Sequence, residues 1–303
     1  MAAAALLACD WGTTHLRAWT LAEDGAVTLA RDFPFGVARL APGEAAARFA
    51  EVRAAMAADL LPVMLCGMVG STLGWTLAAY VDCPADVASV AAGLAPVEDG
   101  GRWVRIAPGV RTAGFNGQGD VMRGEETQLF GWLGAEPGRA VGSHLICHPG
   151  THAKWMVVEA GRLTGFVTAM TGELFGLLRA HGVLKTDAQA DDMAAFDEGV
   201  AAAGDGDALA ARLFTARARV VGLGRPAGTT ASYLSGLLIG AEVAATPRLL
   251  GFGTPAAVTL LGDIALCGLY ARALASRGVG CEIHDGEAAV RAGLLSLWKE
   301  AYR

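Results

Sequence analysis

Two short segments of the chain repeat one plan, and this repetition constrains the fold more than any other feature of the sequence. The first, LLACDWGTTHLRAWTLA, runs from Leu6 to Ala22. An apolar stretch ends on an aspartate and a tryptophan, a Gly-Thr-Thr turn follows, and a second apolar stretch begins. The second segment, LICHPGTHAKWMVV, starts at Leu145 and has the same order. We therefore expect two strand–turn–strand hairpins, one opening each half of the chain.

The residues that follow each hairpin extend the repetition. In the first half, three strand-like runs precede a helical segment, GEAAARFAEVRAAMAADL, and a buried strand, PVMLCGMVG. In the second half, three strand-like runs precede several helical segments and the buried strand AVTLLGD. The first of these helical segments is TGELFGLLRAHGVL, for which Thr171 is the expected N-cap. This order predicts an α/β fold with two similar domains, each a mixed sheet covered by helices.

The boundary between the two domains is expected in the polar, glycine-rich segment AGFNGQGD, residues 113–120. This position gives an N-terminal domain of residues 1–117 and a C-terminal domain of residues 118–303. The terminal helix, about 286–303, could pack back on the N-terminal domain.

Composition argues against several classes of partner. The formal net charge is −6 and the sequence has no lysine–arginine cluster, whereas proteins that bind nucleic acids or anionic membranes present a basic surface. No apolar run approaches the roughly 20 residues of a membrane span, and the start MAAAALLACD lacks the basic region of a signal peptide. The six cysteines are scattered without metal-ligand spacing. We expect a cytoplasmic protein with reduced thiols, and its apolar composition is compatible with a homodimer.

The first turn has the chemistry of a phosphate site. Gly12 allows close approach to the backbone, and the hydroxyls of Thr13 and Thr14 can surround an anion together with nearby N–H groups. Asp10 would repel a phosphate unless a cation lay between them. Mg²⁺ held by the carboxylate, water and phosphate meets this condition. An ordinary hairpin with a solvated aspartate would carry the same residues, so this turn alone does not distinguish the two.

The second turn makes the phosphate interpretation stronger. Gly150, Thr151 and His152 again follow an apolar strand, with Lys154 nearby. Two such turns, in the first hairpins of separate halves, fit a nucleotide whose phosphates are held from both sides of a cleft. His148 and His152 flank the turn, but no third ligand stands at a spacing suited to zinc. We expect neutral histidines that donate to the backbone or to phosphate.

A charged segment, GDVMRGEETQLFG, follows the expected domain boundary. Phosphoryl transfer to a sugar hydroxyl needs a carboxylate that accepts the proton of the attacking oxygen, and Asp120, Glu125 and Glu126 are the candidates. Arg123 could hold a substrate carboxylate in a bidentate fork. A capped helix start would also explain Asp120. It explains Arg123 poorly, because a cation at that position opposes the helix dipole.

Two weaker signals complete the candidate site. Thr171, Gly172 and Glu173 begin a helix whose free N–H groups could receive an anionic substrate, although a simple helix cap needs the same residues. Gly262 and Asp263 join a strand to a helix through small residues that would let a flat base approach. A generic strand–helix joint would look the same.

Several strings together carry a family resemblance. CDWGTTHLRAW, VMLCGMVGSTLGW, GDVMRGEETQLFG, HPGTHAKW, MTGELF and YLSGLLIGAEV closely resemble the 2-dehydro-3-deoxygalactonokinase family over essentially the whole chain. DVMRGEETQ and PGTHAKW are long and unusual, so they are far more specific than a Gly-Thr turn. The family belongs to the group of sugar kinases, actin-like proteins and heat-shock ATPases. The resemblance implies two duplicated ribonuclease H-like (actin-like ATPase) domains that close on ATP.

The resemblance also implies roles for the motifs. The expected ATP-binding residues are those of the first phosphate loop (Asp10, Gly12, Thr13, Thr14), those of the second (Gly150, Thr151, His152) and Gly262 beside the adenosine. In the broader group, the base is an aspartate that opens the helix between the domains. Asp120 matches it when the Gly-Asp pair is aligned, and Glu125 matches it when the following Leu-Phe-Gly is aligned. Both assignments stay open.

The activity implied by the resemblance is ATP-dependent phosphorylation of 2-dehydro-3-deoxy-D-galactonate on its 6-hydroxyl, in galactonate catabolism. Its expected partners are ATP, Mg²⁺ bound through Asp10, and a small sugar acid bound by Arg123 and the Thr171–Glu173 turn. One alternative is a kinase of a different sugar or sugar acid. Another is a non-catalytic actin-like ATP-binding protein, which the fold alone does not exclude.

Overall fold

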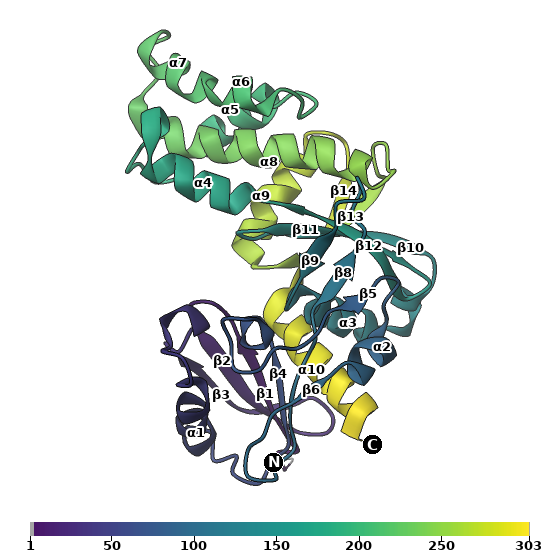
Figure 1. Cartoon of the computed structure of the whole chain (residues 1–303). Coiled ribbons are helices and arrows are strands. Elements are labelled where there is room, and N and C mark those ends of the chain that lie inside the picture. The colour runs from purple at the N-terminus through teal and green to yellow at the C-terminus, as the bar shows by residue number, and fades with distance from the viewer. Residues whose placement is uncertain (1–2, 303) are drawn as a thin grey trace. The chain divides into compact units, whose positions relative to one another are not determined.

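The computed structural model describes residues 3–302, which form two compact units (Figure 1). Unit 1 contains the chain up to Ser143, the segment Val158–Gly165 and the chain from Gly286 onward, and unit 2 contains His144–Val157 and Phe166–Asp285. This division by contacts places the residues between 118 and 143 in unit 1. The domain boundary at residue 117 stays a prediction.

Unit 1 is built on a six-stranded sheet with the order β3-β2-β1-β4-β7-β6. β1 pairs antiparallel with β2, and β2 antiparallel with β3, whereas β1–β4 and β4–β7 are parallel pairs. The hairpin predicted for the first segment is therefore confirmed, and β3 extends it into an antiparallel meander. A small second sheet has the order β5-β8-β9. The strands of unit 1 are β1 (Leu6–Trp11), β2 (Leu16–Leu21), β3 (Val27–Phe33), β4 (Val63–Cys66), β5 (Val81–Asp82), β6 (Ala95–Pro96), β7 (Val104–Ile106), β8 (Val110–Thr112) and β9 (Asp120–Met122).

Four α-helices complete unit 1: α1 (Ala45–Ala55), α2 (Val87–Ala92), α3 (Glu125–Ala135) and α10 (Gly286–Tyr302). The terminal helix α10 packs against α3 and α2 and also contacts β1 and β4. Small residues allow the close approach of α3 and α10, because Gly131 faces the backbone of Ala289 and Gly293 faces that of Thr127. This packing fixes the start of α3 relative to the first sheet.

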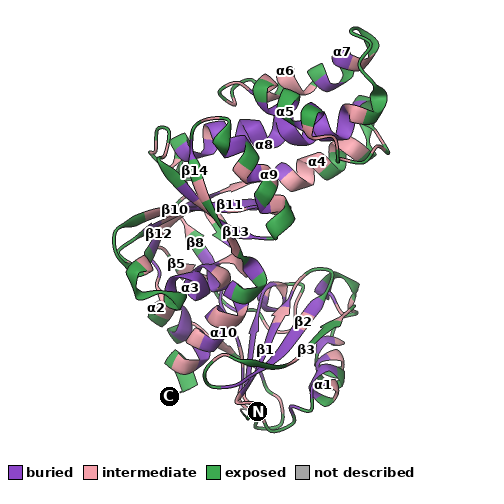
Figure 2. Cartoon of the chain, turned by 180° about the vertical axis from the view of Figure 1, so that it is seen from behind, coloured by how far each residue is buried: buried purple, intermediate pink, exposed green. Residues whose placement is uncertain are grey.

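Unit 2 contains most of a five-stranded sheet with the order β12-β11-β10-β13-β14, whose β11 and β12 extend into the segment Val158–Gly165 that is counted with unit 1. Its strands are β10 (Ser143–His148), β11 (Ala153–Glu159), β12 (Arg162–Ala169), β13 (Ala257–Gly262) and β14 (Gly280–Asp285). Its α-helices are α4 (Thr171–Ala180), α5 (Met193–Ala202), α6 (Leu209–Leu213), α7 (Thr215–Val221), α8 (Thr230–Leu249) and α9 (Ile264–Ala275). Helix α8 contacts α4, α5 and α9 and is buried along most of its length (Figure 2).

The two sheets share one topology. In each, the first three strands in chain order are neighbours, the first strand pairs in parallel with the fourth, and a fifth strand follows in parallel. This shared order confirms the predicted duplication of an α/β domain. In both cases the first strand lies inside the sheet, and its carboxyl end leads into the Gly-Thr turn. That end of the strand is where ligands bind in open α/β sheets.

Each unit has its own apolar core. The core of unit 1 includes Trp11, Phe49 and Val52, and that of unit 2 includes Trp155, Phe196 and Tyr270. None of the helices within residues 3–302 is both long and apolar enough to cross a membrane.

Candidate active site

The first turn, Gly12–His15, is held in place by a segment that follows β3. The N–H groups of Val37 and Ala38 donate to the carbonyls of Gly12 and Thr13, and the Trp11 indole donates to the carbonyl of Phe35. Thr13 and Thr14 remain exposed. The turn is therefore a fixed backbone that presents hydroxyl groups to solvent, as a phosphate loop requires.

An open cavity of about 390 Å³ lies beside this turn, and its lining residues are Asp10, Gly12, Thr14, His15, Arg17 and Asp32. It contains three of the residues assigned to the first phosphate loop. It is also lined by Arg17, which was not predicted from the sequence to belong to the site. Arg17 supplies the cation that an anionic ligand in this cavity would need.

Asp10 is largely buried at the end of β1 and is paired with Arg17. Oδ2 of Asp10 accepts a hydrogen bond from Nη2 of Arg17 at 2.6 Å, and the aspartate side chain is only 14% exposed. Burial raises the pKa of Asp10, the Arg17 guanidinium opposes this rise, and the charge of Glu125 adds to it. Because the charge of Glu125 raises the pKa of Asp10, the start of α3 is close enough to the end of β1 to interact with it electrostatically.

Glu125 and Glu126 open helix α3 directly after Gly124, which is the N-cap and has φ 113°. A glutamate oxygen of Glu125 accepts from the N–H of Arg123 at 3.1 Å, and one of Glu126 accepts from the N–H of Gly124 at 2.6 Å. The two carboxylates thus satisfy backbone donors that the helix start leaves without partners. Glu125 is half-buried and can reach a ligand, whereas Glu126 is fully buried.

The environment of Glu126 favours its neutral form. Burial and the charge of Glu125 raise the pKa of Glu126 to about 7, against the opposing hydrogen bonds from Thr127 and Gly124. Thr127 Oγ1 donates to Glu126 Oε1 at 2.8 Å. Glu126 therefore holds its proton more tightly than an unperturbed glutamate does.

Asp120 does not cap α3. It lies in β9, where Thr112 is its partner on β8, and its Oδ1 accepts from the N–H of Val121 at 2.7 Å. The interpretation of Asp120 as a helix N-cap is wrong, because the backbone turns at Gly124 and the helix begins only at Glu125. The residue that opens this helix is a glutamate.

Arg123 has buried donors that lack a partner. Its guanidinium lies over the Tyr80 ring at 4.6 Å, and Nη2 donates to the carbonyl of Ala78 at 2.8 Å. Nε and Nη1 are buried, and neither has a hydrogen-bond partner among residues 3–302. A buried donor without an acceptor is costly, so these two atoms suit an anionic ligand. Gly70 borders them, since a Cβ there would lie 2.8 Å from Nη1.

The second turn, Gly150–His152, is braced by the start of α4. A Cβ on Gly172 would lie 2.5 Å from the carbonyl oxygen of Gly150, so the two backbones are in close contact and only glycine fits. The N–H of Glu173 donates to the carbonyl of Thr151 at 3.0 Å, and its carboxylate pairs with the His152 ring. Gly172 and Glu173, which follow Thr171, therefore hold the three residues of this turn in place.

Thr171 itself has a different position from the one expected. The N-cap of α4 is Met170, without a side-chain hydrogen bond, and Thr171 is the first helical residue. The prediction of Thr171 as N-cap is wrong by one residue. Its side chain is buried and its hydroxyl is hydrogen-bonded to Glu242, so it faces the protein interior.

Gly262 ends β13 beside the second turn. A Cβ there would lie 3.7 Å from the Pro149 carbonyl oxygen and 3.8 Å from Nε2 of His148. The next residue, Asp263, caps α9 by accepting from the N–H of Leu266 at 2.8 Å. The strand–helix joint at Gly262 and the second turn thus belong to one region of unit 2.

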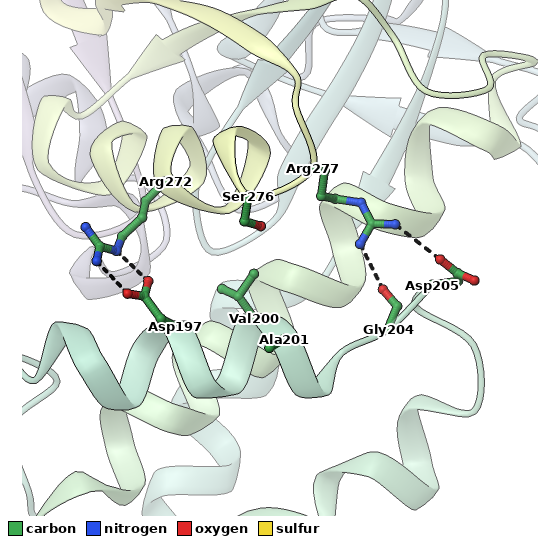
Figure 3. A pocket seen from close by; sticks show the side chains of 8 residues that line it. All are labelled: Asp197, Val200, Ala201, Gly204, Asp205, Arg272, Ser276 and Arg277. Carbon is green, nitrogen blue, oxygen red and sulfur yellow. Dashed lines mark hydrogen bonds and ion pairs between the residues drawn. The ribbon is translucent and has the colours of Figure 1, made fainter.

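A further cavity of about 520 Å³ lies in unit 2 between α5 and the last turns of α9 (Figure 3). Its charged groups pair with each other: Arg272 contacts Asp197, and Arg277 contacts Asp205 and the carbonyl of Gly204. None of the residues assigned to the phosphate loops lines it, so this cavity is a weaker candidate for a phosphate site than the one beside Asp10.

Within residues 3–302, no group of three or more histidine, cysteine, aspartate or glutamate side chains is arranged to hold a metal ion. A carboxylate such as Asp10 still fits Mg²⁺, which typically keeps several waters and binds one or two protein carboxylates together with substrate phosphates.

Three residues of the site region were not predicted from the sequence. Arg17 is the register partner of Asp10 across the β1–β2 hairpin, so counting outward from the turn would have found it. Tyr80 lies far from Arg123 in the chain, and no local pattern relates them. Glu242 could have been noticed, because it is the only acidic residue in the largely apolar helix α8.

Comparison with known proteins extends these observations. Residues 10–297 match the model of the family described as 2-keto-3-deoxy-galactonokinase. A probable 2-dehydro-3-deoxygalactonokinase of Rhizobium meliloti (strain 1021) is 40% identical, over 95% of this chain and 94% of that protein. The 2-dehydro-3-deoxygalactonokinase of Escherichia coli (strain K12) is 35% identical, over 96% of each.

A solved structure agrees with the sequence matches. The crystal structure of a candidate 2-dehydro-3-deoxygalactonokinase from Sinorhizobium meliloti superposes with a TM-score of 0.87 and is 36% identical, covering 97% of this chain and 98% of that one. The likeness therefore extends over both units.

Proposed function

The chain belongs to the 2-keto-3-deoxy-galactonokinase family, and we propose that it transfers the γ-phosphoryl group of ATP to the 6-hydroxyl of 2-dehydro-3-deoxy-D-galactonate, in galactonate catabolism. The family match over residues 10–297 carries this conclusion. The charged segment that opens α3 suits a kinase better than a non-catalytic actin-like protein, because it supplies both an acid and a cation for a substrate. We assign the reaction to the cytoplasm, in keeping with six free cysteines.

The two Gly-Thr turns are the proposed phosphate loops. Asp10, Gly12, Thr13 and Thr14 form the first and Gly150, Thr151 and His152 the second. Support comes from the cavity beside Asp10 and from the backbone of the second turn, which α4 holds rigidly. Gly262 borders the second turn and is the proposed position of the adenosine. Gly172 and Glu173 contribute to the site by holding that turn in place.

Asp10 is the proposed protein ligand of Mg²⁺. The bound ion would neutralise charge on the phosphates of ATP. Asp10 already shares its carboxylate with Arg17, and Arg17 lies in the same cavity. We infer that Arg17 keeps Asp10 ionised and turned toward the phosphate loop, since a buried carboxylate without a cation would take up a proton more readily.

Glu125 is the proposed general base, with Asp120 as the alternative. Glu125 opens the helix that follows the turn at Gly124, and its charge acts on Asp10. A carboxylate in this position can accept the proton of the 6-hydroxyl as its oxygen attacks phosphorus. Both carboxylate oxygens of Glu126 already accept hydrogen bonds, from Thr127 and from the N–H of Gly124, so Glu126 is not proposed as the base.

Arg123 is the proposed partner of the substrate's carboxylate. Nε and Nη1 are buried donors without a partner among the described residues. Nη2 gives one N–H to the carbonyl of Ala78, and its second N–H together with either of these donors can hold a carboxylate in a bidentate fork. Stacking on Tyr80 would hold the fork in one plane. This contact would distinguish a sugar acid from a neutral sugar.

A coupled assay of ADP release across a panel of acceptors tests the function. The panel holds 2-dehydro-3-deoxy-D-galactonate, its gluconate-derived epimer, a neutral hexose and no acceptor. We expect ADP release that depends on the galactonate-derived acid. Equal or faster turnover of another acceptor would reassign the substrate, and ATP binding without acceptor-dependent turnover would favour the non-catalytic alternative.

A further inference from the structure

Glu242 is a buried carboxylate at the centre of unit 2. It lies on α8 and is 5% exposed. Its Oε1 accepts from the Trp155 indole at 2.7 Å and its Oε2 from the Tyr270 hydroxyl at 2.7 Å. The side chain of Thr171 is a third hydrogen-bond partner. The carboxylate is thus bound by three donors from three different elements.

No cation accompanies this acid. Burial raises the pKa of Glu242, and the three hydrogen bonds from Thr171, Trp155 and Tyr270 oppose the rise. No arginine, lysine or histidine of residues 3–302 is among the groups that shift it. Burying an acid in this way is unfavourable, and well-packed apolar residues often replace buried ionic groups without loss of stability. Stability alone is therefore a poor explanation for its presence.

The three donors lie on the elements that surround the second turn. Trp155 belongs to β11, which begins at Ala153 directly after the turn. Thr171 is the first residue of α4, and the next residue, Gly172, packs on Gly150 and Thr151. Tyr270 belongs to α9, which follows the joint at Gly262. Helix α8 contacts both α4 and α9 (Figure 1).

We propose that Glu242 is a positioning residue that sets the second phosphate loop, Gly150–His152, in the geometry that binds the phosphates of ATP. It acts by tying together the strand that leaves the loop and the two helices that flank it. The proposal rests on the assignment of this loop to phosphate binding. It does not depend on which sugar acid is the acceptor.

Two pairs of measurements on the whole protein test this role. Glu242→Gln keeps the shape of the side chain but leaves one carbonyl oxygen where two carboxylate oxygens accepted hydrogen bonds. We expect its Kd for ATP, measured by calorimetry, to rise about 10-fold. Its KM for the sugar acid should change less than about 2-fold, because Arg123 and its surroundings belong to unit 1.

Tyr270→Phe and Tyr233→Phe form a matched pair. Both tyrosines are buried in unit 2, and each loses one hydroxyl, which binds Glu242 in one case and Thr215 in the other. We expect Tyr270→Phe to weaken ATP binding about 3-fold. Tyr233→Phe should leave ATP binding within experimental error of the wild type.

The outcomes separate the possible causes. Unchanged ATP affinity in a folded Glu242→Gln variant would overturn the proposal. If that variant does not fold, the comparison of Tyr270→Phe with Tyr233→Phe tests the proposal. Equal effects of these two substitutions on ATP binding would overturn it, because they would indicate a general loss of packing. Wild-type protein that binds ATP but does not phosphorylate the galactonate-derived acid would contradict the substrate assignment alone.

Discussion

Arg17 and Asp10 are direct partners across the β1–β2 hairpin, and Nη2 of the arginine lies 2.6 Å from Oδ2 of the aspartate. The pair places one buried acid and one cation at the same edge of the sheet, beside the Gly-Thr turn. Both charges suit a phosphate loop, because the aspartate can hold a metal ion and the arginine can pair with a phosphate. The hairpin register alone brings them together.

Asp10→Asn is expected to abolish turnover and leave the fold intact. The amide oxygen can still accept from Arg17, so packing is retained, but the charge that would hold Mg²⁺ is lost. We expect kcat to fall by at least about 10²-fold, the scale of losing one preorganised electrostatic group. Steady-state kinetics and circular dichroism give the two readouts. Asp24→Asn, at an exposed turn of the same unit, is the control, and near-native kcat in Asp10→Asn would remove Asp10 from the mechanism.

Glu125→Gln and Asp120→Asn distinguish the two candidates for the base. Both side chains are half-buried and both substitutions remove only a charge. Because Glu125 opens α3 and acts on Asp10, we expect Glu125→Gln to lower kcat by about 10²–10⁴-fold, the usual contribution of a general base. Asp120→Asn should cost less than about 10-fold. The reverse order in single-turnover rates would assign the base to Asp120.

The strands and the duplicated plan could be predicted from the sequence, because apolar alternation and Gly-Thr turns are local signals. The start of α3 could not. Asp120 resembles an N-cap in the sequence, and only the backbone conformation of Gly124 shows that β9 and a turn come before the helix. The burial of Glu126 was equally hidden, since it depends on how α3 packs in the folded protein and not on the local sequence.

Within the candidate site, residues in contiguous motifs were predictable, as was Arg17 from the hairpin register, but partners from distant parts of the chain were not. Asp10 and Gly150 lie in contiguous motifs whose residue types already indicate a phosphate site. Tyr80 and Gly70 matter only because tertiary folding brings them to Arg123. Thr171 was chosen for a helix start, but its hydroxyl is bonded to Glu242 instead, a partner that no local pattern reveals.

Gly70→Ala is expected to weaken binding of the sugar acid and spare ATP. The added Cβ would lie 2.8 Å from Nη1 of Arg123 and 2.9 Å from Cγ2 of Ile106, so the guanidinium must move away from its present plane. Losing a charged hydrogen bond of this kind should raise KM for the acid about 10-fold. KM for ATP should change less than about 2-fold. Gly138→Ala, where a Cβ would meet open space, is the control, and a parallel rise in both KM values would contradict the role of Arg123.

Glu126→Gln is expected to remove a pH dependence from the stability of unit 1. The pKa of Glu126 is raised from 4.5 to about 7 by burial and by Glu125, so the folded state binds its proton more tightly than the unfolded state does. The stability that this proton provides is fully present below pH 4.5 and is lost as pH rises through 7. At about 1.4 kcal/mol for each pKa unit, the loss is at most about 3.5 kcal/mol.

Urea unfolding of the wild type and of Glu126→Gln at pH 4 and at pH 8 measures this effect. Any fixed cost of the amide, such as a weaker hydrogen bond from Thr127, is the same at both pH values and cancels in the comparison. The variant should therefore gain up to about 3.5 kcal/mol relative to the wild type between pH 4 and pH 8. Glu125→Gln should show part of the same gain, since it removes the neighbouring charge that helps raise this pKa. A difference between wild type and Glu126→Gln that stays constant with pH would mean that the pKa of Glu126 is the same in the folded and unfolded states, with the hydrogen bonds from Thr127 and Gly124 offsetting the effect of burial.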